Sequence, residues 1–237
     1  MAEKSLLHGV ANRSCWKSAS IRKGFMKRIV DVVLSSIAAI ALSPLFVIVS
    51  ILVKLDSQGP VFFRAERVGR WGELFKPFKF RTMVVNAQTI SKVVSTPDDD
   101  PRITRVGRVL RRFNLDELPQ LINVVKGEMS IVGPRPEVPE YVAMFTKEER
   151  IILSIRPGIT DWATLWIRDK GKILVGSREP EKVYMEKIRP EKLRLQIEYV
   201  RNWSMLVDLQ IMLRTIKVHL LDRLWQPKEI MVTLDKR

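Results

Sequence analysis

Two adjacent carboxylates, Asp116 and Glu117, form an acidic pair whose side chains could do chemistry. An ionised aspartate can coordinate a divalent cation, or it can attack phosphorus as a nucleophile. A run of arginines precedes this pair, at Arg102, Arg105, Arg108, Arg111 and Arg112. Guanidinium groups bind phosphate oxygens through paired hydrogen bonds. The combination predicts chemistry on a phosphorylated substrate.

The motif Gly133-Pro134-Arg135-Pro136 places a further arginine on a stiff turn. Its two prolines restrict the backbone on both sides of Arg135, so the guanidinium can be held ready for bidentate contact with phosphate. We expect a diphosphate to lie between Arg135, the upstream arginines and the acidic pair, together with Mg²⁺. The two histidines, His8 and His219, lie near opposite ends of the chain. A metal site built from oxygen ligands is therefore expected, which suits Mg²⁺.

The acidic pair is expected near the start of a short helix. The apolar stripe of that helix is Leu118, Leu121, Ile122 and Val125. Asp116 would project away from the stripe toward a cleft, and the helix dipole would favour its ionised form. The alternative is structural, because Asn114-x-x-Glu117 fits a capping box. The local sequence alone favours a cap, and the stiff turn at Arg135 shifts the balance toward chemistry.

Residues 32–53 form an uncharged apolar run that is long enough for a membrane helix. A basic leader precedes the run and no cleavage pattern follows it, so a cleavable signal peptide is not expected. The Ser43-Pro44 break falls near its middle, and both flanks are basic. We expect a re-entrant helix that enters and leaves through the cytoplasmic leaflet, with Asp31 and Lys54 at headgroup depth. A kinked span and a buried core helix are the alternatives.

Two other segments have clear patterns. Residues 60–82 contain runs of apolar, β-branched and aromatic side chains around Gly69 and Gly72, which predicts a β-hairpin close to the membrane. Residues 203–224 carry leucines and isoleucines at helical spacing. This stripe favours packing on the core, while the alternative is a helix in the headgroup layer, and the two can hold for different faces. We therefore predict an α+β fold, mainly helical, with an interfacial C-terminal helix.

The charge of the chain is strongly basic, with 41 Lys and Arg against 26 Asp and Glu and a formal net charge of +15. Such a surface attracts nucleic acid, anionic lipid or phosphorylated substrates. No nucleic-acid-binding signature is present, and the aromatic residues do not alternate with basic ones, so a nucleic-acid-binding protein is disfavoured. The single cysteine, Cys15, excludes an intramolecular disulfide.

Taken in order, the motifs of this chain resemble those of the bacterial sugar transferases, also called monotopic phosphoglycosyl transferases. The resemblance covers about residues 25–215. The matching motifs are Lys27-Arg28-x-x-Asp31, Ser43-Pro44, Lys54-Leu55-Asp56-Ser57-x-Gly59-Pro60-Val61-Phe62-Phe63-Arg64, Phe78-Lys79-Phe80-Arg81-Thr82-Met83, Asp100-Pro101-Arg102-Ile103-Thr104, Leu115-Asp116-Glu117-Leu118-Pro119-Gln120, Gly133-Pro134-Arg135-Pro136, Pro157-Gly158-Ile159-Thr160 and Asp208.

This resemblance implies a reaction in two steps. Asp116 is similar to the nucleophile that attacks the β-phosphorus of a UDP-sugar, which expels UMP and leaves a covalent phosphosugar on the enzyme. Polyprenyl (undecaprenyl) phosphate then attacks this intermediate, giving a polyprenyl-diphosphate-sugar. The step would initiate synthesis of a surface glycan such as an exopolysaccharide, O-antigen, capsule or glycoprotein.

The resemblance also implies the residues of the site. Mg²⁺ would lie at Asp116 and Glu117. The side chains implied to hold phosphate are those of Arg81, Arg102, Arg111, Arg135 and Arg168. Family members often continue Pro-Gly-Ile-Thr with glycine, whereas Asp161 follows here, which leaves the sugar donor open. A non-catalytic scaffold of the same fold is the second alternative, and the intact acidic pair argues against it.

Location and organisation follow from the same resemblance. The expected site of action is the cytoplasmic face of the bacterial inner membrane, in contact with anionic lipid. The expected division is an N-terminal tail over 1–24, a re-entrant membrane helix over 25–56 and a cytoplasmic sugar-phosphate transferase domain over 57–237. The sequence leaves a homodimer possible, and nucleic acid is not an expected partner.

Overall fold

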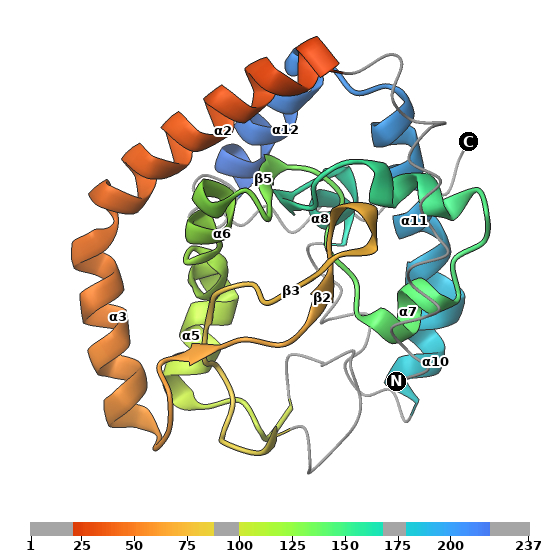
Figure 1. Cartoon of the computed structure of the whole chain (residues 1–237). Helices are drawn as coiled ribbons and strands as arrows, with labels where there is room; N and C mark the ends of the chain where they lie inside the picture. The colour runs from red at the N-terminus through yellow and green to blue at the C-terminus, as the bar shows by residue number, and fades with distance from the viewer. Residues whose placement is uncertain (1–20, 88–99, 168–178, 219–237) are drawn as a thin grey trace.

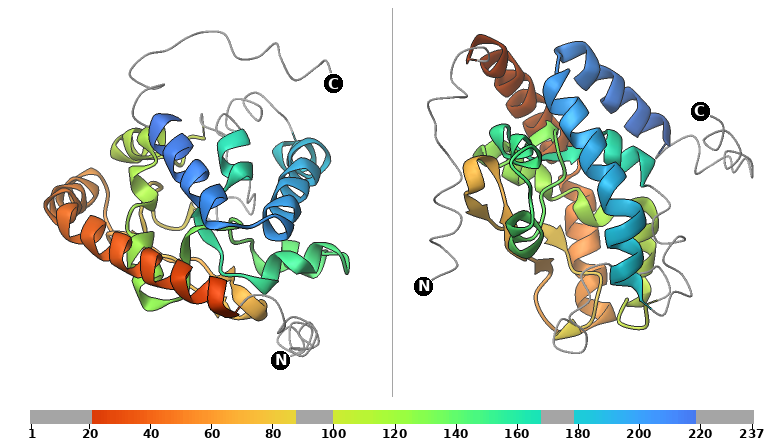
Figure 2. Two further views of the ribbon diagram at one scale, coloured as in Figure 1. Left: turned by 90° about the horizontal axis from the view of Figure 1, so that it is seen from above. Right: turned by 90° about the vertical axis from the view of Figure 1, so that its right-hand side faces the viewer.

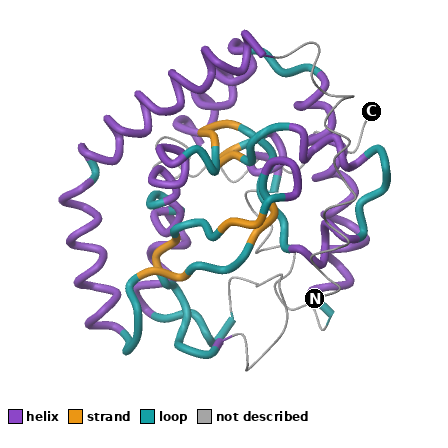
Figure 3. The backbone as a smooth tube through the Cα atoms, in the orientation of Figure 1, coloured by secondary structure: helices purple, strands orange, loops and turns teal. Residues whose placement is uncertain are grey.

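A computed structural model describes residues 21–87, 100–167 and 179–218. It confirms the predicted mainly helical α+β class, with short strands, drawn orange in Figure 3, in the middle of the molecule. The helical elements are α2 (Ile21–Ala41), α3 (Ser43–Asp56), η1 (Arg70–Gly72), α5 (Arg105–Phe113), η2 (Leu115–Glu117), α6 (Gln120–Lys126), α7 (Pro139–Ala143), η3 (Glu149–Ser154), α8 (Trp162–Trp166), α10 (Pro180–Val183), η4 (Tyr184–Ile188), α11 (Arg189–Arg201) and α12 (Met205–Ile216). The strands are β1 (Phe62–Phe63), β2 (Arg67–Val68), β3 (Leu74–Phe75), β4 (Lys79–Phe80), β5 (Ser130–Val132) and β6 (Gly158–Thr160).

Helices α2 and α3 form a bent pair that follows one edge of the molecule (Figure 1). The break lies where expected, because Pro44 stands in the first turn of α3 and Ser43 Oγ donates a hydrogen bond of 2.7 Å to Ile40 O. Among the described helices, none is by itself long and apolar enough to cross a membrane. Gly24–Ala41 and Ser43–Asp56 meet that test only together, with a bend of 60° between them. By length and composition, the pair fits either a broken span or a re-entrant loop.

The first turns of α2 pack onto the rest of the chain through charged side chains. Arg28 donates to Val124 O at 2.6 Å, in the last turn of α6, where carbonyl groups lack helical partners. Asp31 accepts hydrogen bonds from Ser130 Oγ at 2.8 Å and from Ile131 N at 3.1 Å. Asp31 is therefore buried against β5. Sequence patterns could not show this, because the partners of Asp31 lie about a hundred residues away. Its expected position at headgroup depth, like that of Lys54, stays a prediction.

The predicted hairpin over 60–82 is confirmed as an antiparallel ribbon. Strands β1 and β4 pair Phe62 with Phe80, and β2 and β3 pair Val68 with Leu74 nearer the tip. Phe80 is buried with apolar side chains of α3 and α5, so the base of the ribbon is fixed against the bent helix pair. Side chains alternate along a strand, and Lys79 therefore points to the opposite face, toward η2.

Strands β5 and β6 are parallel neighbours, paired from Ser130 with Gly158 to Val132 with Thr160. The chain leaves β5 through Gly133, whose backbone lies against Gly158. A Cβ atom added to Gly158 would lie 2.1 Å from Gly133 N, so a side chain at this position would clash. This close approach fixes where the stiff turn begins.

Helix α12 confirms the helix expected after residue 203 as far as Ile216, and residues 219–224 of that prediction lie outside the described part. Its start lies close to the start of α2 (Figures 1 and 2), where Lys27 pairs with Asp208. Asp208 and Ile211 are the side chains that it buries. The apolar stripe faces outward instead, with Leu206 72% exposed and Leu213 58% exposed. The expectation that this stripe packs on the core is therefore wrong for the described residues.

Candidate active site

The acidic pair lies in η2, a single 3-10 turn between α5 and α6. Asn114 ends α5 in the left-handed conformation with φ of 53°, so the chain reverses direction immediately before the pair. The helix proper begins only at Gln120, and its buried face contains Leu121 and Val124 while Val125 is 40% exposed. The predicted apolar stripe is thus partly wrong, because the preceding turn is not α-helical.

Lys79 lies between the two carboxylates. Its Nζ is 2.9 Å from Asp116 Oδ2 and 3.0 Å from Glu117 Oε1 (both distances are within ion-pair range). Asp116 is 2% exposed and depends on protein groups for its solvation. Sequence reasoning did not single out Lys79. The available signal was a lysine between two aromatic residues of a strand, which places its side chain on the face opposite to the buried Phe80.

Arg135 completes the cluster. Its Nη1 donates to Glu117 Oε2 at 2.8 Å, and its Nη2 donates to Glu117 Oε1. The structure thus brings Arg135 to the acidic pair, but its fork binds a carboxylate instead of facing open space. The capping-box alternative is wrong, because the Glu117 carboxylate is engaged by Arg135 and Lys79 and no side chain caps η2.

These cations control the ionisation of Glu117. Burial alone would raise the pKa of the Glu117 carboxyl, but Arg135 and Lys79 outweigh that effect and hold the pKa well below its usual value of 4.5. In return, Glu117 raises the pKa of the Arg135 guanidinium despite burial. Glu117 is therefore an anion at neutral pH, and Arg135 keeps its charge.

Replacing Arg135 with methionine should make protein stability less sensitive to acid. The low pKa of Glu117 stabilises the wild-type fold above about pH 4.5, and this stabilisation is lost as pH falls through the lower folded-state value. Without Arg135, only Lys79 opposes the burial of Glu117, so its pKa rises and the acid-dependent loss shrinks. Unfolding free energies measured in chelator from about pH 6 to about pH 3 check this.

The matched control for that series is Arg194→Met. Arg194 pairs with Glu191 on the surface, at 58% exposure of its side chain, where solvent screens the interaction. Its removal should alter the acid profile less than the loss of Arg135. Equal profiles for the wild type and Arg135→Met would contradict the assigned role of Arg135.

The other predicted arginines are placed differently. Arg81 donates to Ser57 O at 2.7 Å and to Gln58 O, so it binds the chain just after α3. Arg102 forms an ion pair with Asp100 at 2.6 Å and donates to Ala87 O at 2.8 Å. Both side chains are buried among these acceptors. In the part of the chain that the structure describes, no hydrogen bond or ion pair joins them to Asp116 or Glu117.

Two arginines of the prediction remain. Arg111 is half-buried in the last turn of α5 and lies close enough to Asp100 to lower the pKa of that carboxyl, after the larger effect of Arg102. Within the described residues, no hydrogen bond or ion pair joins Arg111 to the acidic pair. Arg168 lies outside the described residues.

The donor set of the site fits Mg²⁺ that is shared with a substrate. Within the described ranges, no group of three or more His, Cys, Asp or Glu side chains could hold a metal ion. However, both carboxylates of the acidic pair converge on one cation, the ammonium of Lys79. Mg²⁺ is commonly held by one or two carboxylates together with substrate phosphates and water. Asp116 and Glu117 are the residues that would hold it here.

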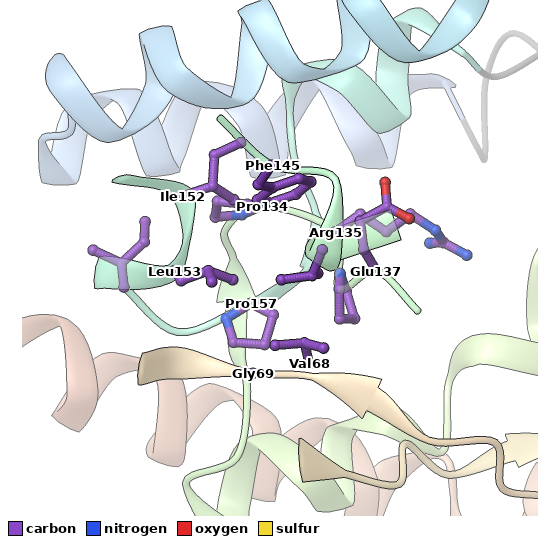
Figure 4. Close-up of a pocket in the computed structure, with 12 residues that line it drawn as sticks. Val68, Gly69, Pro134, Arg135, Glu137, Phe145, Ile152, Leu153 and Pro157 are labelled. Atoms are coloured by element: carbon purple, nitrogen blue, oxygen red, sulfur yellow. The ribbon is translucent and has the colours of Figure 1, made fainter. Parts of the chain in front are cut away.

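A hollow lies behind the stiff turn (Figure 4). It is lined by apolar side chains that include Phe145, Ile152 and Leu153, while the charged ends of Arg135 and Glu137 extend to the other side. Apolar packing therefore supports one face of the turn, while Arg135 reaches the acidic pair and Glu137 pairs with Lys192.

Comparisons with known proteins identify the family of this chain. Residues 22–222 match the family described as "Bacterial sugar transferase". The exopolysaccharide production protein ExoY of Sinorhizobium fredii is 39% identical over 215 residues, which cover 84% of this chain and 88% of that protein. The UDP-glucose:undecaprenyl-phosphate glucose-1-phosphate transferase of Escherichia coli (strain K12) is 37% identical over 194 residues, covering 81% of this chain.

The chain spans only part of some relatives. It covers 39% of the Escherichia coli protein. It covers 36% of the undecaprenyl-phosphate glucose phosphotransferase of Komagataeibacter xylinus, which is 38% identical over 203 residues. The shared part includes the acidic pair and the stiff turn, which lie well inside the matched residues. The chain therefore belongs to the bacterial sugar transferase family and is an enzyme, a phosphoglycosyl transferase.

Proposed function

We propose that this protein transfers a sugar-1-phosphate from a UDP-sugar to undecaprenyl phosphate, releasing UMP and producing undecaprenyl-diphosphate-sugar. Two of the relatives named above, those of Komagataeibacter xylinus and Escherichia coli, act on undecaprenyl phosphate according to their names, and the second also acts on UDP-glucose. The observation that carries the proposal is the buried Asp116 beside Glu117, Lys79 and Arg135. This arrangement supplies a nucleophile together with positive charge for a diphosphate.

In the proposed first step, an oxygen of Asp116 forms a bond to the β-phosphorus of the donor. The bond from that phosphorus to the bridging oxygen breaks, UMP leaves with the electron pair, and an aspartyl phosphosugar remains. In the second step, an oxygen of undecaprenyl phosphate attacks the same phosphorus. The aspartyl bond then breaks and Asp116 returns as a carboxylate, so no oxidant or reductant is needed.

The neighbouring side chains support both steps. Lys79 holds Asp116 in place through its ammonium group, and its 27% exposed side chain can reorient when a substrate arrives. Glu117 stays ionised because of Arg135 and Lys79. Mg²⁺ bound at the acidic pair would offset the diphosphate charge and polarise the phosphoryl group. Arg135, whose side chain is 28% exposed at the edge of the cluster, would bind donor phosphate.

The proposal includes a membrane location at the cytoplasmic face of the bacterial inner membrane. Two features support it, the bent apolar pair α2–α3 and the outward apolar stripe of α12. The net charge of +15 favours contact with anionic lipid headgroups. A lipid-linked acceptor makes such a position useful, because its phosphate stays at the headgroup layer.

Reporter tags at the two ends of the chain should both be accessible only from the cytoplasmic side. A re-entrant pair returns the chain to the leaflet that it entered, so neither end crosses. Labelling by an impermeant reagent in intact spheroplasts and in inside-out vesicles measures this. A tag on a periplasmic protein serves as the labelling control. Labelling of the N-terminal tag from outside would show a spanning helix and reject the re-entrant form.

The experiment that tests the proposed function is a UMP-release assay. Purified protein is mixed with Mg²⁺, undecaprenyl phosphate and, in turn, each member of a panel of UDP-sugars. We expect UMP release that depends on one or a few of these donors, since sugar preference is a property of the site. Failure to release UMP from every donor would overturn the proposal.

A further inference from the structure

Side chains on one face of α11 contact the segment 132–137, which contains Arg135, directly or through Asp161. The side chains of this face are Lys192, Gln196 and Tyr199, which recur at four- and three-residue spacing and are 5%, 1% and 1% exposed. They reach the turn at three successive places. Tyr199 OH donates to Asp208 Oδ1 at 2.7 Å and lies 3.3 Å from Val132 O, just before the turn.

The middle contact passes through Asp161, a fully buried carboxylate that precedes α8. Asp161 Oδ2 accepts the backbone N–H of Arg135 at 3.1 Å and the side-chain amide of Gln196 at 2.9 Å. The other oxygen, Oδ1, accepts the N–H of Thr164 and so caps α8. One carboxylate thus ties Arg135 to both α8 and α11.

The third contact is a buried ion pair between Lys192 and Glu137, two residues after Arg135. Tyr184 OH lies 3.3 Å from both Lys192 Nζ and Glu137 Oε1. On a regular α-helix, residues eight apart differ by about 80° around the axis. The π-helical turn η4 (Tyr184–Ile188) removes most of this difference and brings Tyr184 and Lys192 to the same face. Such turns are frequent at functional sites.

Stability alone does not account for this polar face. Buried charges and amides lose their hydration, and apolar side chains of similar volume commonly stabilise a core at least as well. Hydrogen bonds, by contrast, fix positions and directions that apolar contacts leave free. The three contacts involve Val132, Arg135 itself and Glu137, which all lie within three residues of Arg135.

From these contacts we infer that the inward face of α11 is a template that positions Arg135 for the donor diphosphate, with Asp161 and Lys192 as its main positioning residues. The inference rests on the proposed function, because it assigns Arg135 to the donor. It adds residues that do not touch the reacting atoms but determine where the guanidinium lies.

Asp161→Asn tests the central contact with little other change. The asparagine Oδ1 can still cap α8, since asparagine is a good N-cap residue. A flip of the Gln196 amide would turn its Oε1, which has no partner in the described structure, toward the new amide group as an acceptor. The N–H of Arg135 is then the donor that loses its acceptor. The matched control is Glu149→Gln, which removes a carboxylate that also accepts a backbone N–H, that of Thr146 at 2.7 Å. Within the described residues, Glu149 forms no hydrogen bond or ion pair with Lys192, Gln196 or Tyr199.

Two measurements decide the outcome. In donor kinetics, with active enzyme counted by trapped phosphosugar, Asp161→Asn should lower kcat/KM for the donor by about tenfold or more, mainly through KM. In hydrogen exchange, the amides of residues 132–137 should exchange at least about tenfold faster than in the wild type. Glu149→Gln should leave donor KM and this local exchange unchanged, even where it lowers thermal stability.

A second pair of variants tests the inference independently if Asp161→Asn does not fold. Lys192→Met leaves Glu137 buried without its cation, and Lys192→Arg restores the charge. We expect turn protection to fall in Lys192→Met and to return in Lys192→Arg. Wild-type donor KM and turn exchange in Asp161→Asn would overturn the inference. A wild-type protein that releases no UMP would reject the proposed function, and hydrogen exchange would still decide whether Asp161 positions the turn.

Discussion

Asp116→Asn should abolish trapping of radiolabelled phosphosugar and lower UMP release by at least about a thousandfold, because it removes the nucleophile of a covalent reaction. Asparagine has nearly the same shape, and its amide oxygen can still accept a hydrogen bond from Lys79. The fold and membrane association should therefore remain. The measurement is denaturing electrophoresis after incubation with donor labelled in its β-phosphate, without acceptor.

A matched control removes a carboxylate elsewhere. Glu148→Gln removes an exposed ion pair with Arg201 that includes no residue of the active site. This variant should trap phosphosugar at the wild-type level. Glu117→Gln distinguishes the role of Glu117 from that of Asp116. If it loses turnover while trapping persists, Asp116 alone carries the covalent bond. Full turnover by Asp116→Asn would remove Asp116 from its proposed role.

The sequence predicted the elements whose patterns are local. The hairpin over 60–82, the break at Ser43-Pro44 and the helix after residue 203 follow from apolar and aromatic runs, proline geometry and helical spacing. Each depends on neighbours within one or two turns of chain. The stiff turn at Arg135 belongs to the same class, because two prolines and a close glycine contact determine it.

Long-range contacts could not be predicted. Lys79 reaches the acidic pair across 38 residues, and Asp31 reaches β5 across about a hundred. The arginines of the motifs show the same limitation. Arg81 and Arg102 have the charge that phosphate requires, but backbone carbonyls and Asp100 take their hydrogen bonds. Charge identifies candidates, whereas burial and nearby acceptors decide which of them remain available.

The α12 stripe shows why amphipathic patterns leave the environment open. Leucines at helical spacing define a face but not what that face meets. In this chain, the inward face of α12 contains Asp208 and Ile211, and the richer apolar face is exposed. Such a face is costly in water. The proposed lipid contact gives it a partner, whereas the core offers none within the described residues.

Lys79→Met should cause the second largest loss, lowering kcat/KM by about a hundredfold, with a decrease in unfolding free energy of about 3–5 kcal/mol. Both figures follow from leaving buried carboxylates without their shared cation, since Lys79 Nζ is 2.9 Å from Asp116 and 3.0 Å from Glu117. Thermal unfolding and donor kinetics measure the two effects. Lys126→Met is the control, because Lys126 is exposed and lies 5.2 Å from the Phe78 ring without pairing to the acidic pair.

Added Mg²⁺ makes the Lys79→Met prediction more specific. If the ammonium occupies the place of a cation between the carboxylates, its removal should leave a site that Mg²⁺ fills more readily. A ligand that binds only the folded state raises its stability, so the Mg²⁺-dependent increase in Tm should be larger in Lys79→Met than in the wild type. Lys79→Arg keeps the charge and should behave more like the wild type in this respect. Equal Mg²⁺ responses in Lys79→Met and the wild type would mean that the ammonium and the metal do not share one place, and Lys79 would then act on Asp116 alone.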